Sequence, residues 1–147
     1  MTEREIIAEH VHTHAERVGF SAPESLEYYL VDLLTSRIRQ TQIIPEPSFA
    51  ERYLQLYDTK TRPSEIREYA DQCLFFTGLL PEYGHRRGLD VDYYASLGIS
   101  SYYTVGDITE DDRMIQLGNW FYHLQKFLNS ALHPDTKLEL ININVRY

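Results

Sequence analysis

The sequence is poor in cysteine, glycine and proline, and it lacks long hydrophobic runs. Of its 147 residues, one is cysteine, seven are glycine and six are proline. The single cysteine, Cys73, excludes an internal disulfide and a multi-cysteine zinc site, and it is typical of a reducing compartment. No stretch approaches the roughly 20 apolar residues of a membrane-spanning helix, and charges interrupt the N-terminal segment where a signal peptide would be apolar. We therefore expect a cytoplasmic protein with no membrane partner.

Positive charge is also scarce. Lysine and arginine total 14 against 22 aspartates and glutamates, so the formal net charge is -8 at pH 7. A field of this sign repels the phosphates of nucleic acids, and we expect no nucleic-acid partner. Hydrophobic residues make up 43% of the chain, which is enough to bury a core, and the length suits one domain of roughly 100–150 residues. We expect residues 1–147 to form a single domain.

Hydrophobic periodicity and helix-start signals predict about six helices. A Ser or Thr followed three residues later by an acidic side chain can cap a helix, because each side chain then satisfies an exposed backbone N–H group. This pattern occurs at Thr2, Ser21, Ser48 and Thr109. Two further starts are expected near Pro63 and Asp90. The predicted helices cover residues 3–18, 24–39, 48–59, 64–80, 91–104 and 110–132, which indicates an all-α, single-domain bundle.

The predicted helix over residues 64–80 differs from the others because it is apolar on nearly all sides. Its second half reads Cys-Leu-Phe-Phe-Thr-Gly-Leu-Leu from Cys73 to Leu80. A helix of this kind is expected to be surrounded by other helices. Ala70, Cys73 and Thr77 form a stripe of small side chains along which another backbone can approach closely. We predict that this helix lies at the centre of the bundle.

Three histidines lie in the predicted helix over residues 3–18, at His10, His12 and His14. His10 and His14 share a helix face, but His12 points away and the sequence shows no third metal ligand. Some di-iron centres use Glu-x-x-His spacings, and the sequence has two: Glu9 with His12 and Glu82 with His85. The first pair points away from the apolar side of its helix, and the second lies past the end of a predicted helix. His14 falls within the apolar stripe of Ile7, Val11, Ala15 and Val18. We expect a half-buried His14 and neither a metal ion nor another cofactor.

Tyrosine is abundant, with 12 residues, and several occur as adjacent pairs. Adjacent positions on a helix point about 100° apart, so one tyrosine of a pair can enter the core while its neighbour lies near the rim. Rim tyrosines suit protein interfaces, and tyrosines can equally fill gaps between short helices. The pairs are Tyr28–Tyr29, Tyr93–Tyr94 and Tyr102–Tyr103.

The segment His85-Arg86-Arg87 is a local cluster of positive charge between two predicted helices. Such a loop can bind a phosphate or carboxylate, or its arginines can pair with nearby acidic side chains. Convergence of these three residues with Tyr93 and Tyr94 would form a small-ligand pocket. The sequence has no nucleophile motif and no phosphate-binding glycine loop, so we predict no catalytic residues.

The C-terminal segment 137–147 alternates apolar and polar residues and is rich in β-branched side chains, which favours extended structure. A lone strand needs a partner. We expect this tail either to pair with its copy across a dimer axis or to lie extended on the helices.

Two segments, FFTGLLPE over Phe75–Glu82 and VDYYASLGISSYY over Val91–Tyr103, resemble a pattern in an uncharacterised bacterial family of helical proteins. The resemblance implies a bacterial helical protein and no particular reaction. From the sequence we expect a non-enzymatic interaction or regulatory module whose aromatic helical surface binds a protein partner or a second copy in a homodimer. The alternative is a small-ligand-binding protein or enzyme with its pocket near residues 82–94.

Overall fold

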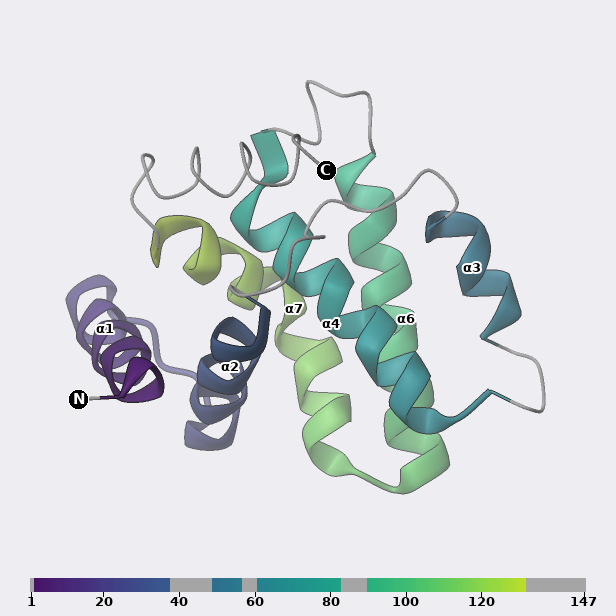
Figure 1. Ribbon diagram of the computed structural model, residues 1–147, viewed down its shortest axis with the longest axis horizontal. Helices are drawn as coiled ribbons and strands as arrows, with labels where there is room; N and C mark the ends of the chain where they lie inside the picture. The colour runs from purple at the N-terminus through teal and green to yellow at the C-terminus, as the bar shows by residue number, and fades with distance from the viewer. Residues whose placement is uncertain (1, 38–48, 57–60, 83–89, 132–147) are drawn as a thin grey trace.

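The computed structural model describes residues 2–37, 49–56, 61–82 and 90–131, and within these ranges it contains six α-helices and no strand. The predicted all-α class is therefore confirmed. The largest differences from the predicted ends are at two helices: one ends at Gln55 instead of residue 59, and another continues to Thr109 instead of ending at 104. The helices are α1 (Glu3–Val18), α2 (Glu24–Arg37), α3 (Phe49–Gln55), α4 (Pro63–Leu79), α6 (Val91–Thr109) and α7 (Asp112–Ala131) (Figure 1).

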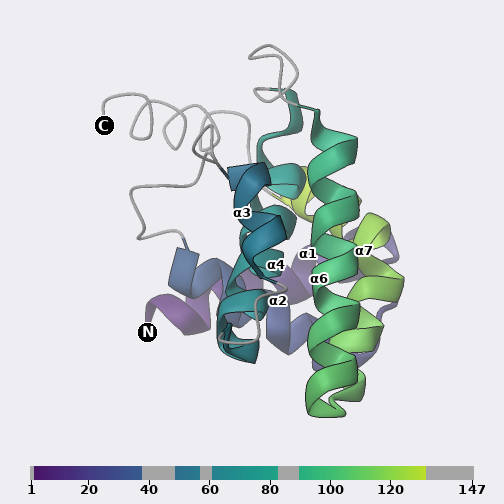
Figure 2. The ribbon, with the colours of Figure 1, turned by 90° about the vertical axis from the view of Figure 1, so that its right-hand side faces the viewer.

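Helices α4, α6 and α7 lie side by side at the centre of the molecule (Figures 1 and 2). Glycines allow these helices to approach closely. A Cβ atom at Gly98 of α6 would lie 2.7 Å from the Cβ atom of Cys73 in α4. A Cβ atom at Gly118 of α7 would lie 2.6 Å from the ring of Tyr103 in α6. The small side chain of Cys73 in α4 thus allows a close approach of another backbone, as the sequence predicts, and Gly118 allows a second close approach between α6 and α7.

Burial is greatest along α4, which confirms its predicted central position. Leu74, Phe76 and Leu79 have no solvent-accessible surface. Full burial of a large apolar side chain stabilises a fold by about 1.5–3 kcal/mol relative to exposure. The second half of α4 therefore contributes much of the hydrophobic driving force. Apolar residues of α7 complete this core, among them Leu117, Phe121, Leu124 and Leu128.

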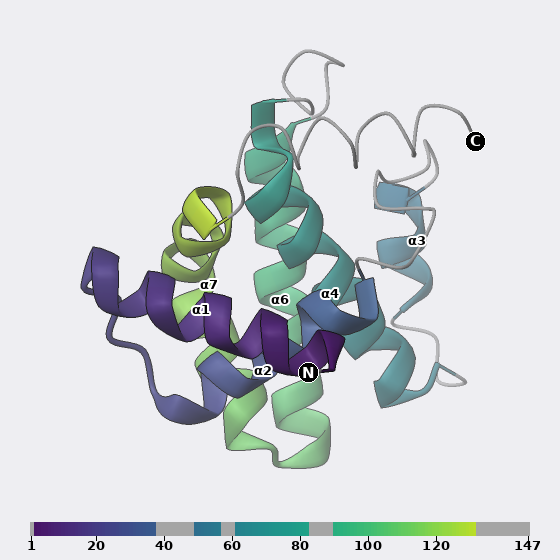
Figure 3. The same cartoon turned by 60° about the vertical axis from the view of Figure 1, so that its left-hand side comes forward.

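Helices α1 and α2 lie on one side of this centre, and α3 lies on the opposite side (Figure 1). Figure 3 shows that α1 runs across the direction of α4 and α6. The buried residues of α1 are Val11, His14 and Ala15. The predicted burial of Val18 is wrong, because Val18 ends the helix and remains exposed. The left-handed backbone of Gly19 turns the chain away at that point.

Three helices begin where the capping patterns predict. Thr2 and Glu5 form a reciprocal capping box at α1. Pro63 is the first residue of α4, and the carboxylate of Asp90 accepts a hydrogen bond from a first-turn amide of α6. The positions of these helices are therefore encoded by local chemistry that needs no tertiary contact.

The predicted cap at Thr109 is wrong. Thr109 still belongs to α6, and its hydroxyl donates a hydrogen bond to the carbonyl oxygen of Val105. Asp111 caps α7 instead, because its carboxylate accepts a hydrogen bond from the Arg113 amide at 2.9 Å. Thr109 and Asp111 can both cap a helix, and the turn of the backbone between α6 and α7 places Asp111 at the start of α7.

Several predictions concern residues outside the described ranges. The C-terminal segment 137–147 and the cluster His85-Arg86-Arg87 both lie there. The extended tail, its pairing across a dimer axis and the role of that cluster therefore stay predictions.

Candidate functional site

A groove with a volume of about 590 Å³ lies between α1 and α2. The buried Val31 and the half-buried Ala8 form its apolar floor, and the exposed ring of Tyr28 stands at its rim. This volume falls within the roughly 300–1,000 Å³ of typical ligand pockets. The lining residues are Thr2, Arg4, Glu5, Ala8, His12, Glu24, Glu27, Tyr28 and Val31.

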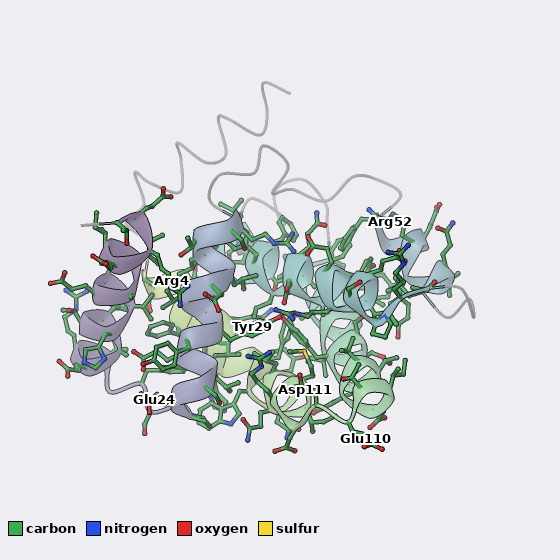
Figure 4. The ribbon with its side chains drawn as sticks, turned by 60° about the horizontal axis from the view of Figure 1, so that its bottom comes forward. Arg4, Glu24, Tyr29, Arg52, Glu110 and Asp111 are labelled. Carbon is green, nitrogen blue, oxygen red and sulfur yellow. The ribbon has the colours of Figure 1, made fainter. Side chains whose placement is uncertain are left out.

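Polar contacts connect α1 and α2 beside this groove. Arg4 of α1 forms an ion pair and hydrogen bond with Asp32 of α2. His12 of α1 lies 3.2 Å from the carboxylate of Glu27 in α2 and 3.1 Å from that of Glu16 one turn along. The pairs run in opposite sequence directions, so the two helices are antiparallel. Figure 4 shows Arg4 and Glu24 beside this helix pair.

The tyrosine pairs divide between core and surface as the sequence predicts. In α2, Tyr28 is 59% exposed and Tyr29 is 3% exposed. In α6, Tyr93 is 49% exposed, whereas Tyr94 is 5% exposed. Tyr102 is fully buried and its neighbour Tyr103 is half-buried. Among the exposed members of these pairs, Tyr28 lines the groove between α1 and α2.

The structure describes two of the five residues that the sequence suggested for a ligand pocket. Tyr93 is exposed at the start of α6. Tyr94 points into the core, where its ring lies near those of Phe49 and Phe76, with centroids 5.8 and 5.9 Å away. The helix thus directs the two neighbours to different environments. Whether His85, Arg86 and Arg87 join Tyr93 stays a prediction.

A set of histidine contacts attaches α1 to the end of α7. The Nε2 atom of His14 lies 2.8 Å from the Ser130 hydroxyl, and Arg17 donates a hydrogen bond to the Nδ1 atom of His14 at 2.9 Å. The Nε2 atom of His10 lies 2.7 Å from the carbonyl oxygen of Ala131. Burial, together with the charges of Arg17 and His10, lowers the pKa of His14 from its ordinary value. His14 is thus more deeply buried than the half-buried position expected from the sequence.

A buried polar cluster lies where α2, α4 and α6 meet. The hydroxyl groups of Tyr29 and Tyr102 both donate hydrogen bonds to the Oδ1 atom of Asp71, at 2.5 and 2.7 Å. Arg67 donates to the Tyr29 hydroxyl at 3.0 Å, and its Nε atom lies 4.0 Å from the Oδ2 atom of Asp71. Figure 4 shows Tyr29 on the inner side of α2, toward the centre. The guanidinium of Arg113 lies over the Tyr29 ring, 5.3 Å from its centroid.

The electrostatics of this cluster indicate a structural role. Burial raises the pKa of Asp71, and the hydrogen bonds from both tyrosines and the charges of Arg37 and Arg67 oppose that rise. Burial and the Asp71 carboxylate raise the pKa of Tyr29 and Tyr102. The donors to Asp71 are protein hydroxyls, so its carboxylate is satisfied without a substrate. Such a network specifies how helices meet.

Sequence reasoning missed Asp71 because its partners lie far away in the chain. Tyr29 and Tyr102 are 42 and 31 residues from it. One signal was available: Asp71 sits between Ala70 and Cys73, on the apolar side of the predicted central helix. A carboxylate there is costly without partners, which indicates that hydroxyl or cationic side chains must meet it.

The cysteine and histidine predictions can also be compared with the structure. Cys73 is a buried core residue as expected, and burial raises the pKa of its thiol. Glu9 and His12 both lie on the exposed side of α1. Within the described ranges, no group of three or more His, Cys, Asp or Glu residues could hold a metal ion.

None of the helices described here is long and apolar enough to cross a lipid bilayer.

Comparison with protein-family models, curated proteins and solved structures finds no match to this chain. The resemblance to bacterial helical proteins stays a prediction, and the candidate site rests on its own geometry.

Proposed function

We propose that this protein is an interaction module whose groove between α1 and α2 binds a basic, amphipathic helical segment of a partner protein. The observation that carries the proposal is the groove itself, which combines an apolar floor with a rim rich in carboxylates. Apolar floors supply binding energy, and charged rims select the partner and increase the association rate. No catalytic group is required for this role.

Charge favours a basic partner. Three glutamates line the groove, Glu5, Glu24 and Glu27. The positive charge of Arg4 is offset by its ion pair with Asp32. The net charge of -8 adds a long-range field of the same sign. A segment with lysine or arginine at the edges of its apolar face therefore complements the groove, whereas an acidic segment is repelled.

The shape favours a helix. The two walls are antiparallel helices of 16 and 14 residues, and an amphipathic helix can lay its apolar face along such a groove. Its anchors at positions i, i+3, i+4 and i+7 would contact the floor formed by Ala8 and Val31. Tyr28 would cover one of them and offer its ring face to a lysine or arginine.

Binding can be tested with two designed helical peptides that share the same leucine anchors. One carries lysines on its polar face, and the other carries glutamates. We expect saturable binding of the lysine peptide, with NMR shift changes confined to α1 and α2, and no binding of the glutamate peptide. Binding of both, or shift changes centred elsewhere, would contradict the proposal. Light scattering of the free protein shows whether it forms a homodimer. This matters because a homodimer that occupies the groove would exclude the peptide.

Matched variants separate the groove from general charge attraction. Glu24→Lys should weaken binding of the lysine peptide by about tenfold, since a rim charge changes sign. Glu51→Lys makes the same charge change on an exposed residue of α3 and should have little effect. Tyr28→Ala should weaken binding by about tenfold, whereas Tyr122→Ala, at a similarly exposed tyrosine of α7, should not. Equal losses within either pair would exclude the groove as the binding site.

A further inference from the structure

The hydrogen bonds around His14 define its protonation state. A guanidinium group can only donate, so the Nδ1 atom of His14 must accept the bond from Arg17 and carry no proton. The neutral ring then carries its proton on Nε2, which donates to the Ser130 hydroxyl at 2.8 Å. That hydroxyl in turn donates to the carbonyl oxygen of Phe127 at 2.9 Å. Each donor in this series of hydrogen bonds has an acceptor only while the imidazole of His14 is neutral.

We infer that His14 is a pH-sensitive latch that holds α1 on the C-terminal end of α7 while its imidazole is neutral and releases α1 when the imidazole is protonated. The side chain is buried against the Phe127 ring, with centroids 5.3 Å apart. Protonation would place an N–H group of the ring against the Arg17 guanidinium. Two cationic donors would then face each other, one of them buried.

The surrounding charges do not compensate for a proton on His14. From α1, the facing groups are Arg17 and His10, whose ring lies 6.4 Å from that of His14. From α7, the contacts are the uncharged Ser130 and Phe127. Two titratable side chains of α7, His123 and the cationic Lys126, line a surface hollow together with Ser130 and Phe127, and no carboxylate lines that hollow. No carboxylate is recorded against His14 within the described part of the chain, and the lowered pKa of its imidazole agrees with this.

His10 makes a second contact between α1 and α7. It is exposed and donates through Nε2 to the carbonyl oxygen of Ala131, the last residue of α7. This contact joins α1 to α7 independently of the contact between His14 and Ser130. Variants at the two histidines therefore show which contact carries the pH response.

The consequence for binding rests on the proposed function. Because α1 is one wall of the groove, its release would separate Ala8 from Val31 and remove the floor. A partner segment would be bound at neutral pH and released in acid. The latch itself needs no partner, so it can be tested on the free protein.

Hydrogen–deuterium exchange of the full chain tests the latch without peptide. After correction for intrinsic exchange, we expect the amides of α1 to exchange about tenfold faster at about pH 5.5 than at about pH 7.5, while those of α6 change little. An NMR titration of the His14 ring should show protonation in the same pH range as the release. Exchange in α1 that is independent of pH, or that rises equally in α6, would overturn the inference.

Four variants complete the test. His14→Gln cannot be protonated and should lose the pH response, whereas Glu9→Gln, which removes an exposed titratable group of the same helix, should keep it. Arg17→Gln removes the facing cation and should weaken the release of α1 in acid, because a protonated His14 then meets no cationic donor while α1 is docked. His10→Gln should leave the response intact, and loss of the response would overturn the assignment to His14. If His14→Gln does not dock α1 at neutral pH, the Arg17→Gln variant still decides the outcome, and an acid response as large as that of the unaltered protein would overturn the latch. Failure of peptide binding with an intact pH response would refute only the proposed function.

Discussion

The central layer of α4, α6 and α7 and the peripheral helix α1 are held in place by different kinds of contact. The central helices meet at glycines and fully buried apolar side chains, such as Gly98 against Cys73. Helix α1 buries only Val11 and Ala15 among its apolar residues, and polar contacts add to its attachment, including Arg4 with Asp32 and His14 with Ser130. Apolar contact does not respond to pH or to a charged partner, whereas polar contact does. We therefore expect the centre to provide stability, and α1 and α2 to respond to pH and to a charged partner.

The largest expected effect comes from breaking the central layer. Gly98→Val should destabilise the protein by about 3 kcal/mol, because the new side chain would overlap both Cys73 and Phe121. Chemical denaturation measures this loss. Gly19→Ala is the matched control, since the space around Gly19 is open and only its positive φ of 70° opposes a side chain, at a cost of about 1 kcal/mol. Equal losses would show that close helix contact is not what stabilises the centre.

A slightly smaller effect is expected at the polar cluster within the same centre. Asp71→Ala should cost about 2–3 kcal/mol, because the hydroxyls of Tyr29 and Tyr102 lose their buried acceptor. Denaturation of the single variants and of the double variant with Tyr102→Phe gives the coupling energy. We expect the Tyr102→Phe change to cost much less in the Asp71→Ala background. Additive losses would mean that the two groups do not stabilise each other.

The smallest effect should be confined to α1. Thr2→Ala removes the capping box and should destabilise this helix by about 1 kcal/mol. Hydrogen–deuterium exchange should increase in the first turns of α1 while the denaturation midpoint hardly changes. Thr13→Ala, at an exposed position within α1, is the control and should not increase exchange. A large shift in the global midpoint would show that α1 and the central layer unfold as one unit, against the comparison.

Most of the fold could be predicted because its signals are local. Capping at Thr2, Pro63 and Asp90 depends on neighbours within one helical turn. The opposite fates of Tyr28 and Tyr29 follow from the angle between adjacent helix positions. Predictions failed at helix ends. At Thr109 two possible caps compete, and at Val18 the helix has passed beyond the core, so the side chain stays exposed.

The candidate site was much less predictable. The rim tyrosines were expected to provide a binding surface, but the sequence could not indicate that Tyr28 would share a groove with Glu5 and Ala8 of another helix. The order of the hydrogen bonds from Arg17 through His14 was equally hidden, because it depends on Ser130 at the far end of the chain. Contacts between distant segments leave no periodic signal.

By itself, the sequence determined the all-α class, the extent of most helices, the central position of α4 and the face that each helix buries. These properties follow from hydrophobic spacing and capping, which act over a few residues. Only the tertiary structure decided that Asp71 would meet two tyrosine hydroxyls, that α1 and α2 would enclose a groove, and that His14 would be buried against Phe127 and Ser130 of α7. Each of these depends on the relative placement of helices, which the summed packing of side chains selects and no short pattern encodes.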